Sequence, residues 1–375
     1  MTLALNATFL TLLSLLVGGS LLSLSSNPHW FIRGWDFPRV QIIVAAWLVT
    51  FATFLTVWWG HSSSRGPIWT AVAITICLTA WHGFQIFPYT PIAPKQAKST
   101  VSHEKMHHRK DASTLRVVIS NVEMENNQYD LWMKTIRDAD PDVLIALEVD
   151  KKWVAAVSSL SAEFPEQVTI PQDNWYGMMM WSKLPMVDQQ IRYLVQDDIP
   201  SIDAHVRMQD GHLMRVIAVH PRPPEPVRGN DATARDAELT LWGLELAAET
   251  EPTVIGGDLN DVAWSSTTRL FLRTSEMLDP RRGRGMFNTF NAERFWMRYP
   301  LDHIFVSPHF TISDVHLLPF VGSDHFPIQI DLCHAPERRH EHDVMTAEEG
   351  DKEEANEKIE RALDDPKTNG EAVKR

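Results

Sequence analysis

The stretch TVIGGDLNDVAW, residues 253–264, changes character abruptly in its middle. It opens with an apolar run that is typical of a buried strand, and Gly256 and Gly257 then lead into Asp258 and Asn260. An ordinary strand-ending turn is one explanation. We instead expect the glycines to permit a tight turn and the close approach of a substrate, and the acid and amide to take part in a reaction.

The same arrangement recurs along the chain, because carboxylates, amides and imidazoles interrupt or end several apolar runs. Any one of them alone could be a cap or turn residue, but their recurrence favours a shared site. The residues are Asn121 in ISNV, Glu148 in LEVD, His220 in AVHP, Asp258 and Asn260 in GGDLN, Asp302 and His303 in PLDHI, and Asp324 and His325 in GSDHF.

Strand-like and helix-like segments are mixed in this part of the chain. LRVVISNV, PDVLIALEV, PTVIGGD, LDHIFVS and HFPIQIDL have strand character, Met178–Trp181 is interpreted as a core strand, and a hairpin is expected about Asp210–Gly211. NQYDLWMKTIRDAD and DAELTLWGLELAAE have helical spacing. The pattern predicts an α+β fold with two packed sheets and helices outside them.

Three apolar runs precede this region, Leu3–Leu24, Val40–Gly60 and Ile68–Phe87. Each is long enough to cross the roughly 30 Å hydrocarbon core as a helix. We therefore predict a membrane anchor of three transmembrane helices over residues 1–88. A signal peptide is the alternative for the first run, but a basic start and a clear cleavage site are missing.

The distribution of basic residues favours one orientation of this anchor. With three spans, the loop of Arg33 and Arg39 shares a side with everything after the third helix, and the opposite loop has only Arg65. Because basic residues accumulate on the inner side, the count places the following domain in the cytoplasm. We expect an integral membrane protein.

Composition divides the remainder of the chain. Residues 89–114 are expected to form a polar stalk with prolines and histidines, residues 115–335 the main domain, and residues 336–375 a charged tail that is disordered or transiently helical. HEKMH in the stalk matches a zinc-protease pattern, but without an apolar helix face it is interpreted as a basic, histidine-rich juxtamembrane segment. The two cysteines are not expected to pair.

Charge is spread unevenly. Residues 1–110 carry a net +6, residues 111–335 carry −14 and residues 336–375 carry −5, which together give the −13 of the whole chain. A domain this acidic is a poor general partner for a nucleic-acid backbone, although it could bind cations.

In order along the chain, SNV, LEVD, HP, GGDLND, LDHIFVS and SDHFPI resemble the motifs of the endonuclease/exonuclease/phosphatase family, over roughly residues 115–332. With RGWDFPRVQ, FPYTPIAPKQ and the apolar helices, the chain also resembles the bacterial members of that family that are membrane-anchored. This resemblance implies an integral protein of a bacterial cytoplasmic membrane. The resemblance implies a four-layer α/β sandwich, in which helices flank two packed mixed β-sheets, and divalent-metal-dependent hydrolysis of a phosphoester.

Metal binding is expected from oxygen ligands. Glu148 is a hard ligand of the kind that Mg²⁺ prefers, with Mn²⁺ as the alternative. Asn121 could hold a ligand water or a phosphate oxygen without added charge, and Asp324 could join the metal shell. Glu123 is longer than the acid that many relatives carry two residues after the asparagine, which leaves one metal or two open.

The remaining residues are assigned to catalysis. Asp258 would orient or deprotonate the attacking water, and Asn260, two residues on in an extended chain, would point to the same face. His325 would act as the other acid/base or phosphate-stabilising group, with Asp302 accepting from its far ring nitrogen. His220 could donate to the phosphate. Arg298 is the preferred phosphate clamp among the candidates Arg222, Arg228, Arg235 and Arg298.

Three functions remain in competition. The leading hypothesis is a membrane-anchored, Mg²⁺-dependent phosphoester hydrolase, a phosphodiesterase or phosphatase that acts on a lipid headgroup, a lipid-linked phosphate or a small phosphoester. A DNA endonuclease or exonuclease keeps the chemistry but conflicts with the acidic charge. A non-catalytic, membrane-bound binding module would lack a catalytic group, and none of those named is missing. Beyond the lipid bilayer and the substrate, no protein partner is inferred.

Overall fold

The computed structural model of the chain describes residues 2–59, 65–100 and 114–368. These residues divide into two compact units, Met1–Pro88 with Pro224–Ala232, and Tyr89–Pro223 with Thr233–Arg375. The zinc-protease-like motif at residues 103–107 lies outside the described residues.

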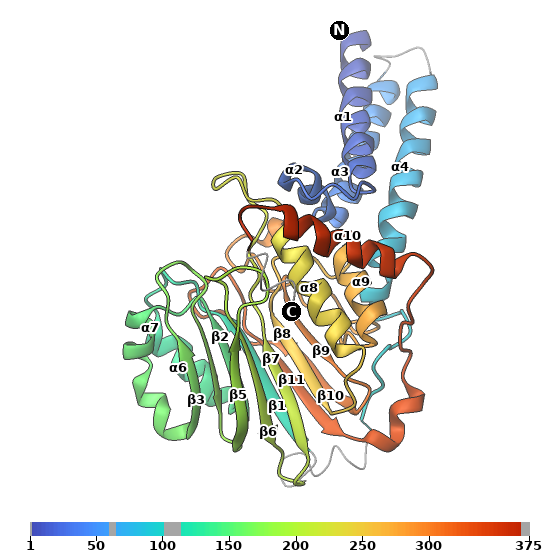
Figure 1. The fold of residues 1–375 in the computed structure, drawn as a ribbon. Helices are drawn as coiled ribbons and strands as arrows, with labels where there is room; N and C mark the ends of the chain where they lie inside the picture. The colour runs from blue at the N-terminus through green and yellow to red at the C-terminus, as the bar shows by residue number, and fades with distance from the viewer. Residues whose placement is uncertain (1, 60–64, 101–113, 369–375) are drawn as a thin grey trace. The chain divides into compact units, whose positions relative to one another are not determined.

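The first unit is built on three long helices (Figure 1). They are α1 (Thr2–Leu22), α3 (Arg39–Trp58) and α4 (Gly66–Ile86), with α2 (Trp30–Arg33) and η1 (Gly34–Asp36) between the first two and η2 (Phe87–Tyr89) after the last. All three are long and apolar enough to cross a membrane. Leu13, Ile42 and Leu78 pack inside, whereas Leu48 and Phe84 are exposed.

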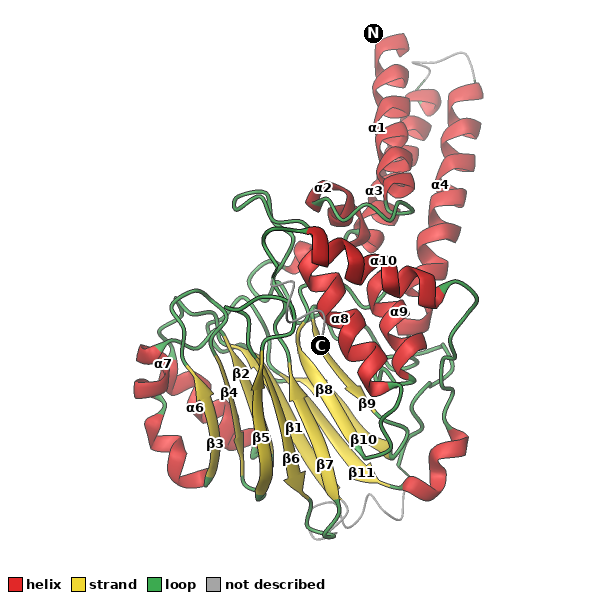
Figure 2. Ribbon diagram, in the orientation of Figure 1, coloured by secondary structure: helices red, strands yellow, loops and turns green. Residues whose placement is uncertain are grey.

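The second unit contains two mixed β-sheets (Figure 2). The first has the strand order β10-β11-β1-β2-β4-β3, with β1 (Thr114–Asn121), β2 (Val143–Leu147), β3 (Glu166–Ile170), β4 (Met178–Ser182), β10 (Phe310–Leu317) and β11 (Ile328–His334). The second has the order β5-β6-β7-β8-β9, with β5 (Met186–Arg192), β6 (Ser201–Arg207), β7 (Leu213–Ala218), β8 (Thr253–Asp258) and β9 (Asp302–Val306).

Alternation along the strands explains the layers. Val117 and Ile119 of β1 pack between the sheets against Val216 and Ile304 of the second sheet, whereas Val118 faces the opposite way. The outer face of the first sheet is covered by α6 (Tyr129–Ala139), α7 (Lys151–Ala156) and η3 (Ser158–Glu163), and that of the second by α8 (Thr233–Leu246) and α9 (Ser266–Ser275). The predicted sandwich of two packed mixed sheets between helices is confirmed.

Two parallel strand pairs determine where loops converge. β1 pairs in parallel with β2, and β7 with β8, whereas the other pairs are antiparallel. The carboxyl ends of each parallel pair therefore lie at one edge. The hairpin expected about Asp210–Gly211 joins β6 to β7, and the Met178–Trp181 segment is the buried strand β4.

The two glycines of β8 serve strand packing. A Cβ on Gly257, whose φ is 153°, would lie 1.8 Å from the carbonyl oxygen of Val219, and one on Gly256 would lie 2.5 Å from both His303 O and Ile119 Cδ1. Both glycines belong to the strand itself. They let neighbouring backbone and core side chains approach, and the approach of a substrate stays a prediction.

The stalk and tail are more ordered than their composition indicates. In the described part of the stalk, Gln96 and Ala97 are buried and Ser99 bridges Ile312 of β10. In the tail, η5 (Pro336–Glu341) and α10 (Asp351–Asp364) form, and α10 lies across α8 and α9 (Figure 1). The tail was expected to be disordered or transiently helical; in the described residues 336–368 it is helical in part, and α10 buries Ala355 and Ala362 on one face.

Candidate functional site

Polar side chains from six strand ends and loops gather at one end of the sandwich. They are Asn121 at the end of β1, Glu148 directly after β2, His220 just after β7, Asp258 at the end of β8, Asp302 at the start of β9, and Asp324 and His325 in the loop before β11. β9 runs antiparallel to β8 and pairs Asp302 with Asp258. The sequence analysis expected these residues in one site, and the fold brings them together.

Asp258 lies at the centre of this cluster and is almost fully buried. Its Oδ2 accepts a hydrogen bond from Asn121 Nδ2 at 3.1 Å and lies 3.6 Å from His325 Nε2 and 3.9 Å from His220 Nε2. Its Oδ1 accepts from the backbone amide of Asn260 at 2.9 Å. Amide and imidazole donors thus surround one carboxylate.

A second carboxylate, that of Asp302, contacts the ring nitrogen of His325 that faces away from Asp258. The distance from its Nδ1 to Asp302 Oδ2 is 2.7 Å, so the ring presents Nε2 to Asp258. Burial lowers the pKa of His325, but Asp302 and Asp258 outweigh burial and raise the pKa to about 10. The two carboxylates therefore favour the imidazolium form of His325, with Nδ1 held by Asp302 and Nε2 directed at Asp258.

Burial shifts the pKa values of three other groups, Glu148, Asp324 and His220, towards their neutral forms. It raises the pKa of Glu148 to about 7 and the pKa of Asp324 to about 6, and it lowers the pKa of His220. Asn121 donates to Glu148 Oε1 at 2.7 Å and so opposes the shift of that carboxylate. A cation near Glu148 and Asp258 would relieve the cost of holding several carboxylates together out of water.

Three residues of this end adopt a left-handed backbone conformation without being glycine. Glu123, Glu148 and Asn260 have φ values of 56°, 64° and 50°. Such conformations are unfavourable for L-residues and persist only where the surroundings enforce them, commonly at functional sites. All three lie within or directly beside the clustered side chains.

The donor set fits a divalent cation. Single ligand atoms of Glu148, His220 and Asp258 lie within 4.8 Å of one another. Asp258, Asp302 and His325 lie equally close, but there the protonated ring of His325 takes the place that a cation would have. Among the described residues, His220 Nδ1 and Asp302 Oδ1 are buried without a hydrogen-bond partner. Carboxylate oxygens are the donors that hard cations such as Mg²⁺ select.

The two other expected ligands lie beside these groups. Asn121 directs its amide nitrogen at Glu148 and Asp258, and its oxygen accepts from the amide of Glu123. Asp324 Oδ1 lies 3.9 Å from His325 Nε2, and the Asp324 backbone amide donates to Glu123 Oε2 at 2.9 Å. Glu123 thus supports Asp324, a role that the sequence analysis did not assign to it.

The geometry expected for Asn260 was wrong. Asn260 does not continue an extended chain, because its φ is 50° and its side-chain amide donates to Pro221 O at 3.0 Å. It remains next to the site through its backbone amide, which donates to Asp258. The reason is that the strand ends at Asp258, so the two-residue periodicity of a strand no longer applies beyond it.

The arginine candidates have other contacts. Arg298 packs over the ring of Phe326, 5.0 Å from its centroid, and donates to Ala292 O at 3.4 Å. Arg222 pairs with exposed Asp198. Arg228 pairs with Glu225, and Arg235 is fully buried among polar partners. A phosphate clamp by Arg298 stays a prediction.

The structure adds two aromatic neighbours that the sequence analysis missed. The ring centroid of Tyr176 lies 5.3 Å from that of His220, and the ring centroid of Phe290 lies 5.0 Å from that of His325. Tyr176 is followed by Gly177, where a Cβ would lie 1.9 Å from Val149 O. In the sequence, Gly177 before the buried strand β4 signals only that the backbone of Val149 comes close, not that Tyr176 lies beside His220.

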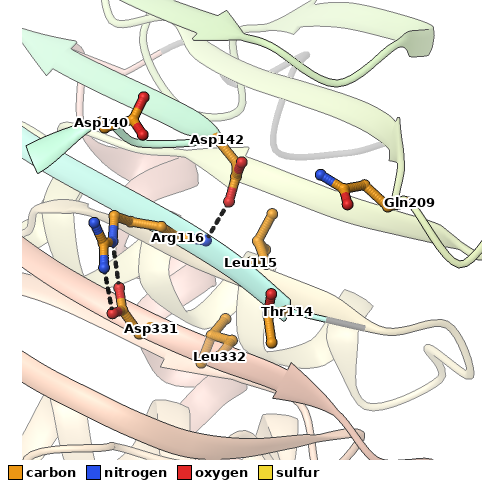
Figure 3. Close-up of a pocket in the computed structure, with 8 residues that line it drawn as sticks. All are labelled: Thr114, Leu115, Arg116, Asp140, Asp142, Gln209, Asp331 and Leu332. Atoms are coloured by element: carbon orange, nitrogen blue, oxygen red, sulfur yellow. Dashed lines mark hydrogen bonds and ion pairs between the residues drawn. The ribbon is translucent and has the colours of Figure 1, made fainter. Parts of the chain in front are cut away.

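The opposite end of the sandwich holds two features outside this cluster. A cavity of about 270 Å³ lies near the start of β1 (Figure 3), but Arg116 within it already pairs with Asp331 through two contacts of 2.7 Å and donates to Ala139 O. Asp210, His212 and His334 also group closely enough for a metal. Asp210 and His212 precede β7, whereas the site follows it.

Comparisons with known proteins agree with this arrangement. Residues 119–325 match the model of the Endonuclease/Exonuclease/phosphatase family. A family protein from Bacteroides thetaiotaomicron has 19% identity, covers 61% of this chain and 98% of its own, and gives a TM-score of 0.50. D. rerio TDP2, complexed with single strand DNA product, has 15% identity, 59% and 99% coverage and a TM-score of 0.50. No curated protein matches the chain. At these identities, the structural likeness concerns the fold.

Proposed function

Because the chain belongs to the endonuclease/exonuclease/phosphatase family, we propose that it is a membrane-anchored, divalent-metal-dependent hydrolase that cleaves a phosphoester by attack of an activated water on phosphorus. The observation that carries the proposal is the buried Asp302–His325 pair, which directs Nε2 of His325 at Asp258 from 3.6 Å. A base, a cationic acid and orienting amides within one buried cluster suit this reaction.

Each residue has a defined task in this proposal. Asp258 orients the attacking water and accepts its proton. His325, as an imidazolium fixed by Asp302, stabilises the charge that develops on the phosphoryl oxygens and protonates the leaving oxygen. His220, whose Nδ1 lacks a partner among the described residues, donates to the substrate. Asn121 donates to the carboxylates of both Asp258 and Glu148 and so fixes their positions relative to each other.

The metal is proposed to be Mg²⁺, with Mn²⁺ able to replace it. Glu148 would hold it, and Asp324 would complete the shell. Asn121 would join it only with its amide reversed, because its nitrogen faces Glu148 and Asp258 and its oxygen accepts from Glu123. When bound, a divalent cation neutralises phosphoryl oxygens and lowers the pKa of water. Binding a cation would lower the free-energy cost of burying several carboxylates close together.

The proposed substrate is presented at a lipid surface. Phe290 bridges both Tyr299 and His325, and the loop that it starts carries η4 (Phe295–Met297). Phe295 and Trp296 in this loop are 75% and 59% exposed. Large apolar side chains exposed beside a polar site are typical of an interaction surface, and aromatic residues are enriched at membrane interfaces.

Nucleic acid is the weaker substrate. Residues 111–335 carry a net −14, whereas proteins that track a phosphate backbone use basic grooves. A structural neighbour, D. rerio TDP2, is complexed with single strand DNA product, so oligonucleotides belong in the assay as a competing class.

The test uses the full chain in detergent or nanodiscs with Mg²⁺. Phospholipid vesicles, a single-stranded oligonucleotide, inositol phosphates and bis(p-nitrophenyl) phosphate are offered in parallel, and Asp258→Asn is the inactive reference. We expect turnover of a vesicle-borne phosphoester, reduced at least about a hundredfold in Asp258→Asn, the usual range for losing a positioned acid/base group. Turnover of none of these substrates would reject the hydrolase in favour of a binding module.

The lipid-surface proposal has a separate control. Phe295→Ser should lower the rate on vesicles more than the rate on the soluble diester. Val187→Ser removes a comparably exposed apolar side chain, at 52%, from strand β5, and should change neither rate. Equal losses of rate on vesicles and on the soluble diester in Phe295→Ser would show that the loop does not recognise lipid. Faster turnover of the oligonucleotide than of the vesicle-borne phosphoester would show that nucleic acid, not lipid, is the preferred substrate.

A further inference from the structure

The C-terminal helix α10 places a lysine inside the second unit. The side chain of Lys358 is 8% exposed, and its Nζ lies 3.1 Å from Asp236 Oδ2 on α8 and 3.2 Å from Thr267 Oγ1 on α9. Figure 1 shows α10 crossing both helices. A buried ammonium is tolerated only where it is paired and hydrogen-bonded, so the packing of α10 and this ion pair depend on each other.

The ion pair continues into the protein through α8. The other oxygen of Asp236 accepts hydrogen bonds from Arg235 Nε at 3.0 Å and Arg235 Nη2 at 2.8 Å. Arg235 is 1% exposed, and its Nη1 donates to the backbone oxygen of Asn260 at 2.9 Å. Its Nη2 also lies 3.5 Å from Asp261 Oδ2. An unbroken chain of charged contacts therefore joins Lys358 to the turn after β8.

That turn carries the central carboxylate of the site. The amide of Asn260 donates to Asp258 Oδ1 at 2.9 Å, and the φ of Asn260 is 50°. A left-handed asparagine keeps its conformation only where its surroundings over-determine it. The guanidinium of Arg235 on Asn260 O and the amide of Asn260 on Pro221 O are two such restraints. The orientation of Asp258 thus depends on Arg235.

We propose that Lys358 is a positioning residue for the site, and that docking of α10 holds Asp258 in its working orientation through Asp236, Arg235 and Asn260. Without Lys358, Asp236 keeps only the guanidinium to balance its buried charge, and Arg235 is drawn away from Asn260 O. The tail would then be a built-in control element, because its release loosens the turn without touching the substrate. The inference rests on the proposed hydrolase function.

The experiment compares two ways of weakening α10. The charged contacts from Lys358 through Asp236 and Arg235 to Asn260 are called the relay here. Lys358→Met breaks the relay at its outer end. Arg273→Gln breaks the other main contact of the helix, the bidentate pair of Arg273 on α9 with Asp351, at 2.8 and 2.6 Å, and leaves the relay intact. Full-length proteins are assayed for kcat and KM, and hydrogen exchange is followed in the backbone amides of residues 258–262.

A small misplacement of a catalytic group can cost up to a hundredfold in rate. We expect Lys358→Met to lower kcat about tenfold or more with KM within about twofold, and to speed exchange at residues 258–262. Lys358→Arg should recover most of the rate, and Arg273→Gln should keep kcat within about twofold of wild type. Lys358→Gln, which keeps a donor without the charge, replaces the methionine variant if that variant does not fold.

Two results would overturn the proposal. Equal losses of kcat in Lys358→Met and Arg273→Gln would show that α10 only stabilises the fold. Unchanged exchange at residues 258–262 in Lys358→Met would show that the relay does not reach the turn. The exchange measurement needs no substrate, so it tests the relay even if wild-type protein hydrolyses none of the substrates, an outcome that would reject the proposed function instead.

Discussion

Replacing Asp302 with asparagine tests how His325 acts. Oδ2 of Asp302 lies 2.7 Å from His325 Nδ1, with both side chains almost fully buried. Burial opposes protonation of His325, yet Asp302 and Asp258 raise its pKa to about 10. Asparagine keeps the shape of the residue, and its side-chain oxygen can still accept a hydrogen bond from Nδ1–H of His325. The main change is therefore the loss of one negative charge beside the imidazolium.

The expected size follows from that contact. A hydrogen bond to a charged group contributes about 1.5–3 kcal/mol, and one pKa unit corresponds to 1.36 kcal/mol. The pKa of His325 should therefore fall by about 1–2 units in Asp302→Asn. Near pH 7 the imidazole stays protonated in both proteins, so any loss there reflects orientation. Near pH 9.5 the ratio of wild-type to variant rates should be roughly 3- to 25-fold larger than near pH 7.

The assay measures the rate of hydrolysis between about pH 6.5 and 9.5 for wild type, Asp302→Asn and one control. Asp314→Asn removes the carboxylate of a similar pair, Asp314 with His316 at 2.8 Å, which is exposed on β10. The control should reproduce the wild-type profile. A wild-type to Asp302→Asn ratio that does not change with pH would refute an imidazolium role for His325.

Three further predictions follow from the site, the anchor and the core. Chelation should abolish hydrolysis and Mg²⁺ or Mn²⁺ should restore it, with Glu148→Gln needing about tenfold more Mg²⁺; full activity in excess chelator would end the metal proposal. A reporter fused after the last residue should be active in the cytoplasm if the basic loops decide orientation, whereas activity only outside would direct the substrate assays to extracytoplasmic phosphoesters. Burial raises the pKa of Glu238 from 4.5 to about 7, with only Ser201 Oγ opposing this shift. Between these values the folded state binds a proton that the unfolded state does not, so stability falls as pH rises, by up to ~3 kcal/mol. Glu238→Gln should therefore raise the melting temperature above wild type near pH 8 and match it near pH 4.5, and an unchanged melting temperature near pH 8 would contradict this.

The layers and the gathering of the site could be predicted because both rest on short-range patterns. Alternating apolar residues indicate which strands are buried on both faces, and a polar residue at the end of such a strand lies at an edge of the sheet. Asn121, Glu148 and Asp258 follow this rule, whereas His325 lies in the loop before β11 and was indicated by its family motif. The pattern fails beyond the last residue of the strand, which is why Asn260, two residues past the end of β8, was assigned an extended conformation that it does not have.

The glycines of β8 show a second limit. Sequence alone indicates that Gly256 and Gly257 need space or an unusual φ, but not which neighbour requires it. The structure identifies Val219 O and His303 O, two backbone atoms of the adjacent strands β7 and β9 and the residues that follow them. A glycine beside catalytic residues can therefore be a packing residue, and its position in the motif does not by itself imply contact with substrate.

The tail marks where sequence reasoning ends, and the cause is the distance along the chain. Lys358 lies 122 positions from Asp236, in a segment whose composition matches that of a solvated helix. A lysine on such a helix is usually exposed, and only the fold shows that α8 and α9 present a carboxylate and a hydroxyl where this lysine arrives. Charge composition measures how many charges a segment has but not whether they are paired. The buried, paired Lys358 is therefore what would allow this helix to act on the site. The comparison of kcat and of hydrogen exchange at residues 258–262 between Lys358→Met and Arg273→Gln measures that effect.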